Sequence, residues 1–145
     1  MTLFTIGFTG KSAEKFFELL QNSKATRVID IRINRTSQLA GFAKEQDLKY
    51  FLPKLAGIDY LVREDLAPDK DLLASYRNKE LNWDLFSQNY RNLLDERGLL
   101  PSLSLAEIEN SVLLCSENEP EKCHRTILAN LLAQIHPTLK VKNLV

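Results

Sequence analysis

The sequence has 145 residues, of which 44% are hydrophobic and 26% are charged. A chain of this length predicts one domain, residues 1–145, whose core needs neither a set of disulfides nor a structural metal. Its 19 basic and 19 acidic residues cancel, which excludes a strong overall attraction to nucleic acid or to an anionic membrane surface.

The first 44 residues predict two strands joined by a helix and followed by a loop. The run LFTI at residues 3–6 is typical of a short strand, and Ser12 is suited to cap the next helix. Residues 27–32 (RVIDIR) predict a second strand that is covered on both faces. Residues 34–44 are polar and irregular, which is typical of a long functional loop.

The rest of the chain continues to alternate between strands and helices. We expect Asp47 to cap a helix that Pro53 breaks and Gly57 ends. The later elements are a strand at 58–62, a partly helical segment at 63–79, a helix from Trp83 to Gly98, a capping box at 104–107, a strand at 112–115, a helix at 124–135 and a strand at 141–145. The alternation predicts an α/β fold with a mostly parallel sheet of about five strands and helices packed on its faces.

Reactive side chains gather where three of these strands end. Ligands bind outside the carboxyl ends of the strands in an open parallel sheet. The candidates are Gly7 after the first strand, Asp30 and Arg32 at the end of the second, Cys115, Ser116 and Glu117 at the end of the fourth, and Cys123, His124 and Arg125 at the start of the next helix. We therefore predict one functional site at this edge of the sheet.

The ligand-binding part of this site is built on two arginines. Arg32 and Arg125 are suited to clamp a phosphate or a carboxylate, and a helix N-terminus beside them favours an anion. Gly7, Asp30 and Ser37 complete the predicted ligand-binding set.

Four residues are the candidates for catalysis. Glu117 and His124 are suited to proton transfer, and Cys115 or Cys123 to a nucleophilic or redox role. Each also has a structural interpretation: a small buried hydrophobe for a cysteine, a cap for the histidine, and an ion pair for the carboxylate. The sequence leaves these alternatives open.

The same cluster does not predict a metal site. Its potential ligands are Cys115, Glu117, Cys123 and His124. Their spacing is not that of a zinc finger or knuckle, and adjacent Cys123 and His124 are expected to point in different directions from a helix. No cofactor fingerprint is present either, so we expect no metal and no cofactor.

These motifs resemble a known family. The pattern Cys115-x-Glu117-x-x-Pro120-x-x-Cys123-His124-Arg125, after an apolar strand, is similar to the domain of unknown function 488 family of small bacterial and archaeal proteins. Shorter matches are Thr5–Phe8, Asp30–Arg32, Ser37-Gln38-x-x-Gly41-Phe42 and Gly57–Tyr60. Many members have a proline where this chain has Arg35 or Thr36. The resemblance covers nearly the whole chain and implies a compact α/β domain, but it implies no reaction.

Three functions are compatible with the sequence. The leading hypothesis is an enzyme or ligand-processing domain that binds an anionic, phosphate-containing small molecule or nucleotide. The second is a nucleic-acid-binding accessory module, since residues 11–54 carry nine basic and five acidic residues with aromatic side chains among them. The residues of that segment are Arg35, Phe42, Lys44, Lys49 and Tyr50. The third is a protein-interaction domain without catalysis.

The location of the protein is predicted from what the sequence lacks. Its N-terminus has no basic start and long apolar core like those of a signal peptide. No apolar run approaches the roughly 20 residues of a membrane span. We therefore expect a cytoplasmic protein with no membrane partner and with both cysteines reduced.

Overall fold

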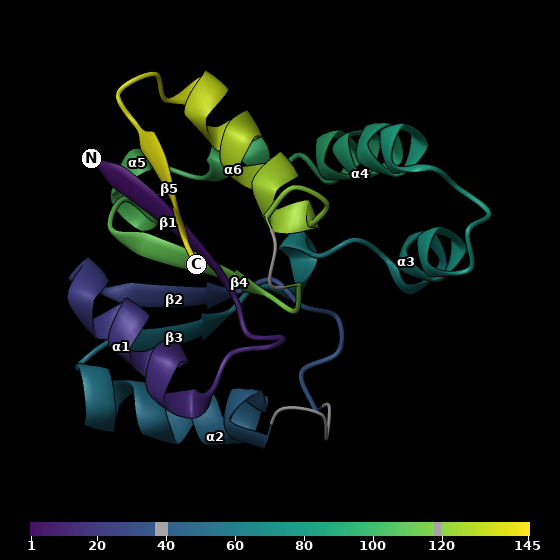
Figure 1. Ribbon diagram of the computed structural model, residues 1–145. Helices are drawn as coiled ribbons and strands as arrows, with labels where there is room; N and C mark the ends of the chain where they lie inside the picture. Colours follow the sequence, from purple (N-terminus) through teal and green to yellow (C-terminus); the bar gives the residue numbers. More distant parts are fainter. Residues whose placement is uncertain (37–40, 118–119) are drawn as a thin grey trace.

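The computed structural model describes residues 1–36, 41–117 and 120–145. Its five strands form one all-parallel sheet in the order β3-β2-β4-β1-β5 (Figure 1). The strands are β1 (Thr2–Gly7), β2 (Arg27–Asp30), β3 (Asp59–Val62), β4 (Ser111–Cys115) and β5 (Lys140–Leu144). The α-helices are α1 (Ala13–Ser23), α2 (Glu45–Phe51), α3 (Lys70–Arg77), α4 (Trp83–Arg97), α5 (Leu105–Ile108) and α6 (His124–Ile135). The predicted α/β fold with a parallel sheet is confirmed.

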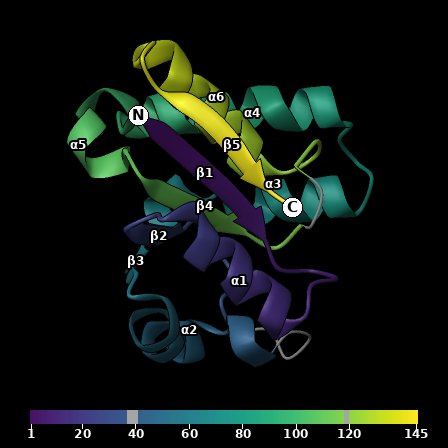
Figure 2. The same cartoon turned by 60° about the vertical axis from the view of Figure 1, so that its left-hand side comes forward.

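The sheet separates two hydrophobic cores, because successive side chains of a strand point to opposite faces. Leu3 and Leu113 belong to the core that α4 and α6 cover. Phe4 and Val112, their neighbours in sequence, belong to the core that α1 and α2 cover. Figures 1 and 2 show these helix pairs on the two sides of the sheet. Cys115 shares the face of Leu113, so its side chain points toward α6.

The longest helix, α4, begins and ends at residues suited to those positions. The side chain of Asn82 accepts a hydrogen bond from the backbone N–H of Leu85 at 2.8 Å, which satisfies one donor of the first turn. The helix ends at Gly98, whose φ of 63° lies in the left-handed region where glycine costs least. This confirms Gly98 as the end of the helix.

Replacing Asn82 with alanine should lower the free energy of unfolding by about 1 kcal/mol, because the cap hydrogen bond is lost. The measurement is urea unfolding followed by circular dichroism. Asn92→Ala is the control, since Asn92 is an exposed residue inside the same helix and alanine favours a helix interior. Equal stability of the two variants would show that this cap does not stabilise α4.

The structure corrects two local expectations. Strand β2 ends at Asp30 rather than at Arg32, so Ile31 and Arg32 already follow the strand. Helix α2 begins after Lys44, whose backbone is extended, and Asp47 lies inside the first turn instead of capping it. An acidic residue in that turn still interacts favourably with the helix dipole, which is why Asp47 is suited to the beginning of a helix in either position.

The predicted break at Pro53 takes the form of a change in helix type. The chain passes from α2 directly into a single π-helical stretch, Leu52–Ala56. Proline has no N–H to donate to the preceding turn, so the regular α-helical pattern cannot continue through it. Gly57, with φ of 63°, ends this segment as expected.

Candidate functional site

A pocket lies at the carboxyl edge of the sheet, on the side that α4 and α6 cover. Its walls combine aromatic, cationic and reactive side chains. They include Tyr76, Trp83 and Phe86 among the aromatic residues, Arg32, Arg77 and Lys122 among the cations, and Cys115, Glu117, Cys123 and His124 among the reactive groups. The structure therefore brings together residues that the sequence assigned to this edge, and it adds side chains from α3 and α4.

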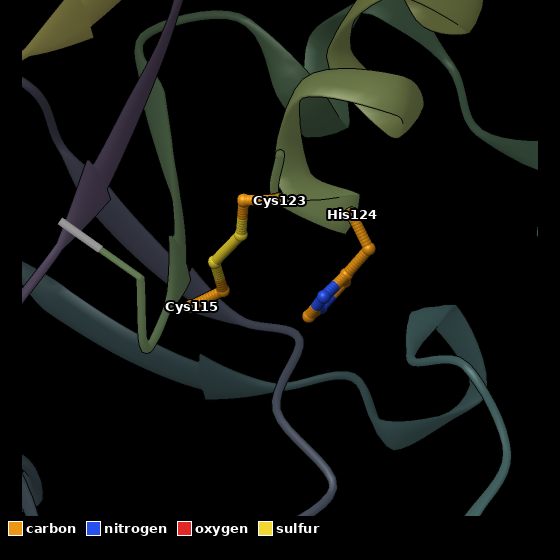
Figure 3. Close-up of side chains that lie close together, drawn as sticks. All are labelled: Cys115, Cys123 and His124. Atoms are coloured by element: carbon orange, nitrogen blue, oxygen red, sulfur yellow. A yellow bond between two sulfur atoms is a disulfide. The ribbon is translucent and has the colours of Figure 1, made fainter. Parts of the chain in front are cut away.

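The two cysteines form a disulfide at one end of this pocket (Figure 3). Cys115 is the last residue of β4, and Cys123 is the residue just before α6. Their Cα atoms lie 7.5 Å apart and both side chains are buried. The expectation of two reduced thiols is therefore wrong for this state of the protein. The disulfide therefore joins the end of β4 to the start of α6.

His124 is the first residue of α6, and its ring is held from the opposite wall of the pocket. Its Nε2 lies 2.9 Å from the backbone oxygen of Ile31. A carbonyl oxygen can only accept, so Nε2 carries the proton and Nδ1 keeps its lone pair. Burial of the ring, with a smaller contribution from the positive charge of Arg125, lowers the pKa of His124 to about 4. The imidazole is therefore neutral at pH 7.

Cys123 and His124 point in the same direction, contrary to the expectation from the sequence. The two sulfur atoms and a ring nitrogen of His124 all lie within 4.8 Å of one another. The reason is that Cys123 is not helical: its φ of −133° and ψ of 142° are extended, and the helix begins only at His124. Figure 3 shows both side chains projecting from the start of α6 toward the end of β4.

Arg125 lies behind the disulfide and does not line the pocket. Its side chain is fully buried, and its Nη1 donates to the sulfur of Cys115 at 3.1 Å and to the backbone oxygen of Glu117. A guanidinium this close to a sulfur atom stabilises the thiolate form of that cysteine whenever the disulfide is reduced. Arg125 is thus placed to act on Cys115 rather than to clamp a ligand together with Arg32.

Arg32 is engaged by Asp30. The guanidinium donates two parallel hydrogen bonds to the carboxylate, Nε to Oδ1 at 2.8 Å and Nη2 to Oδ2 at 2.7 Å, and both side chains are buried. The hydroxyl of Tyr60 donates to the same carboxylate, and the Arg32 guanidinium lies over the ring of Phe8. Burial and the neighbouring Asp30 charge raise the pKa of Tyr60. Asp30 therefore holds Arg32 in place at the pocket wall.

Gly7 allows a close crossing of two chain segments at the ends of β1 and β4. An added Cβ at Gly7 would lie 1.5 Å from the backbone oxygen of Glu117. The backbone N–H of Thr9 also donates to the carbonyl of Ser116 at 3.1 Å, which fixes the same crossing. Gly7 is thus a close-packed position outside the pocket, whereas the carboxylate of Glu117 is exposed at the pocket wall.

Several pocket residues escaped the sequence analysis. Tyr76 and Arg77 come from α3, in a segment that the sequence indicated only as partly helical, and Trp83 was predicted as the start of a helix. Lys122 lies beside the motif without belonging to it. No sequence motif contains any of these four residues. Only Lys122 had a signal in the sequence, which was its position next to Cys123. Ser37 lies outside the described residues.

The segment expected to bind nucleic acid presents a mixed surface. Arg35 forms ion pairs with Glu45 and Glu64, each with an N–O distance of 3.2 Å. The ring of Phe42 packs inward against Phe16, with ring centres 5.4 Å apart. Tyr50 remains exposed on α2. Of the residues considered for stacking and backbone contacts, Arg35 and Phe42 are thus engaged within the protein, whereas Lys49 and Tyr50 are exposed.

The fold and the site define an α/β domain with a parallel sheet and a cysteine–histidine cluster at its carboxyl edge. The chain belongs to the family described as domain of unknown function DUF488, whose model matches residues 12–132. This confirms the resemblance drawn from the motifs. No curated protein and no solved structure matches the chain. Among the helices of the described segments, none has the length and apolar character needed to cross a bilayer.

Proposed function

We propose that this chain is an enzyme or ligand-processing domain that binds an anionic small molecule with a planar apolar part, such as a nucleotide. The observation that carries the proposal is the composition of the pocket at the carboxyl edge of the sheet. Aromatic side chains from α3 and α4 form one wall, and Arg77 of α3, Lys122 and the cysteine–histidine cluster complete the lining. A base would stack on the aromatic wall while its phosphate meets the cations.

Arg77 and Lys122 are the residues we propose for phosphate binding. Both are exposed and both line the pocket, one from α3 and one just before α6. The charge of Arg32 is largely compensated by Asp30, so its contribution to an anion is smaller. The N-terminus of α6 adds a partial positive charge on the same side.

The chemistry of the proposed function would come from the cluster beside the ligand. The Nδ1 lone pair of His124 and the exposed carboxylate of Glu117 are suited to accept a proton. Cys115 and Cys123 become nucleophiles only when their disulfide is reduced. A reducing cytoplasm, the location that the sequence leads us to expect, would favour that dithiol state.

The test is a thermal-shift titration of the oxidised protein with nucleoside mono-, di- and triphosphates and with the parent nucleosides. A phosphate-dependent rise in Tm is expected, because a ligand that binds only the folded state adds about 2.7 kcal/mol at 100 times its Kd. The double variant Arg77→Gln/Lys122→Gln should lose the phosphate-dependent part of the rise. Lys140→Gln/Lys142→Gln is the matched control on β5, at the far edge of the sheet.

The proposal fails if nucleotides and nucleosides raise Tm equally, or if the control variant loses the shift as completely as the pocket variant. A shift that disappears in moderate salt for every anion alike would show only general attraction to positive charge.

A further inference from the structure

We propose that Cys115, Cys123 and His124 bind one Zn²⁺ ion when the disulfide is reduced, with the fourth coordination position facing the pocket. Two cysteines and one histidine, with one position left open, are a donor set that zinc accepts in catalytic sites. The inference goes beyond the proposed function and does not depend on it, because no pocket ligand takes part in holding the ion.

The geometry of the three side chains fits a zinc site. Their ligand atoms lie within 4.8 Å of one another. Zn–S bonds of about 2.3 Å and Zn–N bonds of about 2.0 Å place tetrahedral ligand atoms roughly 3.5 to 3.8 Å apart. Once the S–S bond is open, small side-chain rotations therefore suffice. The cysteine Cα separation of 7.5 Å leaves room for the two sulfur atoms to move that far apart.

The groups that contact the three ligand residues also suit a bound zinc ion. His124 donates its Nε2 proton to the backbone oxygen of Ile31, which fixes the ring and leaves Nδ1 as the nitrogen with a lone pair. Metal-binding histidines almost always donate their other ring nitrogen in this way. The Nη1 of Arg125, 3.1 Å from the sulfur of Cys115, would hydrogen-bond to the coordinated thiolate and offset part of its charge.

The oxidised and the zinc-bound states exclude each other. A dithiol reductant gives two electrons and two protons to the Cys115–Cys123 disulfide and becomes a disulfide itself. Zn²⁺ then displaces the two thiol protons and stays in the +2 state. Oxidation of the two coordinated thiolates by a disulfide re-forms the S–S bond and releases the ion. The presence of zinc at the pocket would thus depend on the thiol redox state of the surroundings.

The experiment uses Co²⁺ as a spectroscopic probe and Zn²⁺ as its competitor. The full chain is reduced with a phosphine and titrated with Co²⁺. We expect one Co²⁺ per chain, with the sulfur-to-cobalt charge-transfer and intense visible bands of a tetrahedral thiolate site, and displacement by one equivalent of Zn²⁺. The oxidised protein is the first control and should give none of these bands, because its sulfur atoms are bonded to each other.

Two histidine variants decide whether His124 is a ligand. His124→Gln should bind Co²⁺ at least about 10-fold more weakly than the wild type. His136→Gln should bind it as tightly as the wild type, because that ring contacts the backbone of Leu103 and lies outside the cluster. Circular dichroism of both variants controls for folding, and Cys115→Ser provides a second test at a sulfur ligand.

Two results would overturn the proposal. One is the absence of Co²⁺ and Zn²⁺ binding by the reduced wild type. The other is unchanged affinity in His124→Gln, which would leave two thiolates alone as the ligands. Neither result bears on the nucleotide titration, which uses the oxidised protein, so failure of the zinc site and failure of the proposed function are distinguishable.

Discussion

Gly7→Ala is expected to lower the free energy of unfolding by at least about 3 kcal/mol. Overpacking a side chain typically costs 1–3 kcal/mol, but here the added methyl would meet backbone, which moves less easily. Its nearest neighbours would be the oxygen of Glu117 at 1.5 Å, the carbonyl carbon of Glu117 at 2.5 Å and the Nη1 of Arg125 at 2.8 Å. Relief requires the segment after β4 to move, which breaks its hydrogen bond with Thr9. Urea unfolding measures the loss.

Gly41→Ala is the matched control for this substitution. Among the described residues other than its chain neighbours, no heavy atom lies within 4 Å of a Cβ added at Gly41, and the residue is exposed. We therefore expect a change of no more than a few tenths of a kcal/mol, or a slight gain from the reduced freedom of the unfolded chain. If Gly7→Ala proved as stable as Gly41→Ala, the close crossing of β1 and the segment after β4 would not hold in solution.

Asp30→Asn is expected to destabilise the protein by about 3–5 kcal/mol, because it leaves the buried Arg32 without a counter-charge. The amide cannot accept both parallel hydrogen bonds that the carboxylate now receives from the guanidinium. A small domain has only about 5–15 kcal/mol of stability in total, so the variant should unfold at a much lower urea concentration.

Two further variants distinguish the contribution of the Asp30 charge to stability from that of its hydrogen bonds. Tyr60→Phe removes one donor to the Asp30 carboxylate and should cost about 1 kcal/mol. The double variant Asp30→Asn/Arg32→Met should be more stable than Asp30→Asn alone, because it removes the uncompensated charge as well. A loss below 1 kcal/mol in Asp30→Asn would contradict the interpretation that the pair secures this part of the pocket.

The sequence was sufficient to predict the elements of this fold but not their arrangement. The apolar β-branched residues of β2 and the glycine that ends α4 are local signals, and both elements formed, although β2 is two residues shorter than expected. The position of β4 between β1 and β2 depends on pairing between residues about 80 to 110 positions apart, which no local pattern encodes. The wrong assignment of Asp47 as the helix cap also has a local cause, because an acidic residue is favourable both at the N-cap and in the first turn of a helix.

The sequence could predict which edge of the sheet brings the candidate residues together, but not how they pair there. Strand ends of a parallel sheet share one edge, so Asp30, Arg32 and Cys115 had to lie near one another. Their pairing could not be predicted, because it depends on burial and on backbone angles at single residues. The extended backbone of Cys123 turns its sulfur toward Cys115, and the complete burial of Arg125 removes it from the pocket. The aromatic wall comes from helices that carry no motif.

The strand order determines when β1 can pair during synthesis on the ribosome. Strand β1 is made first, but its two neighbours in the sheet, β4 and β5, begin only at Ser111 and Lys140. At roughly 5–20 residues per second, β1 waits on the order of 5 to 20 s for its first partner. Until then only β2 and β3 can pair. The nascent chain therefore carries an apolar, unpaired strand while the roughly 100 residues between β1 and β4 are made, and the sheet closes only after β4 has emerged.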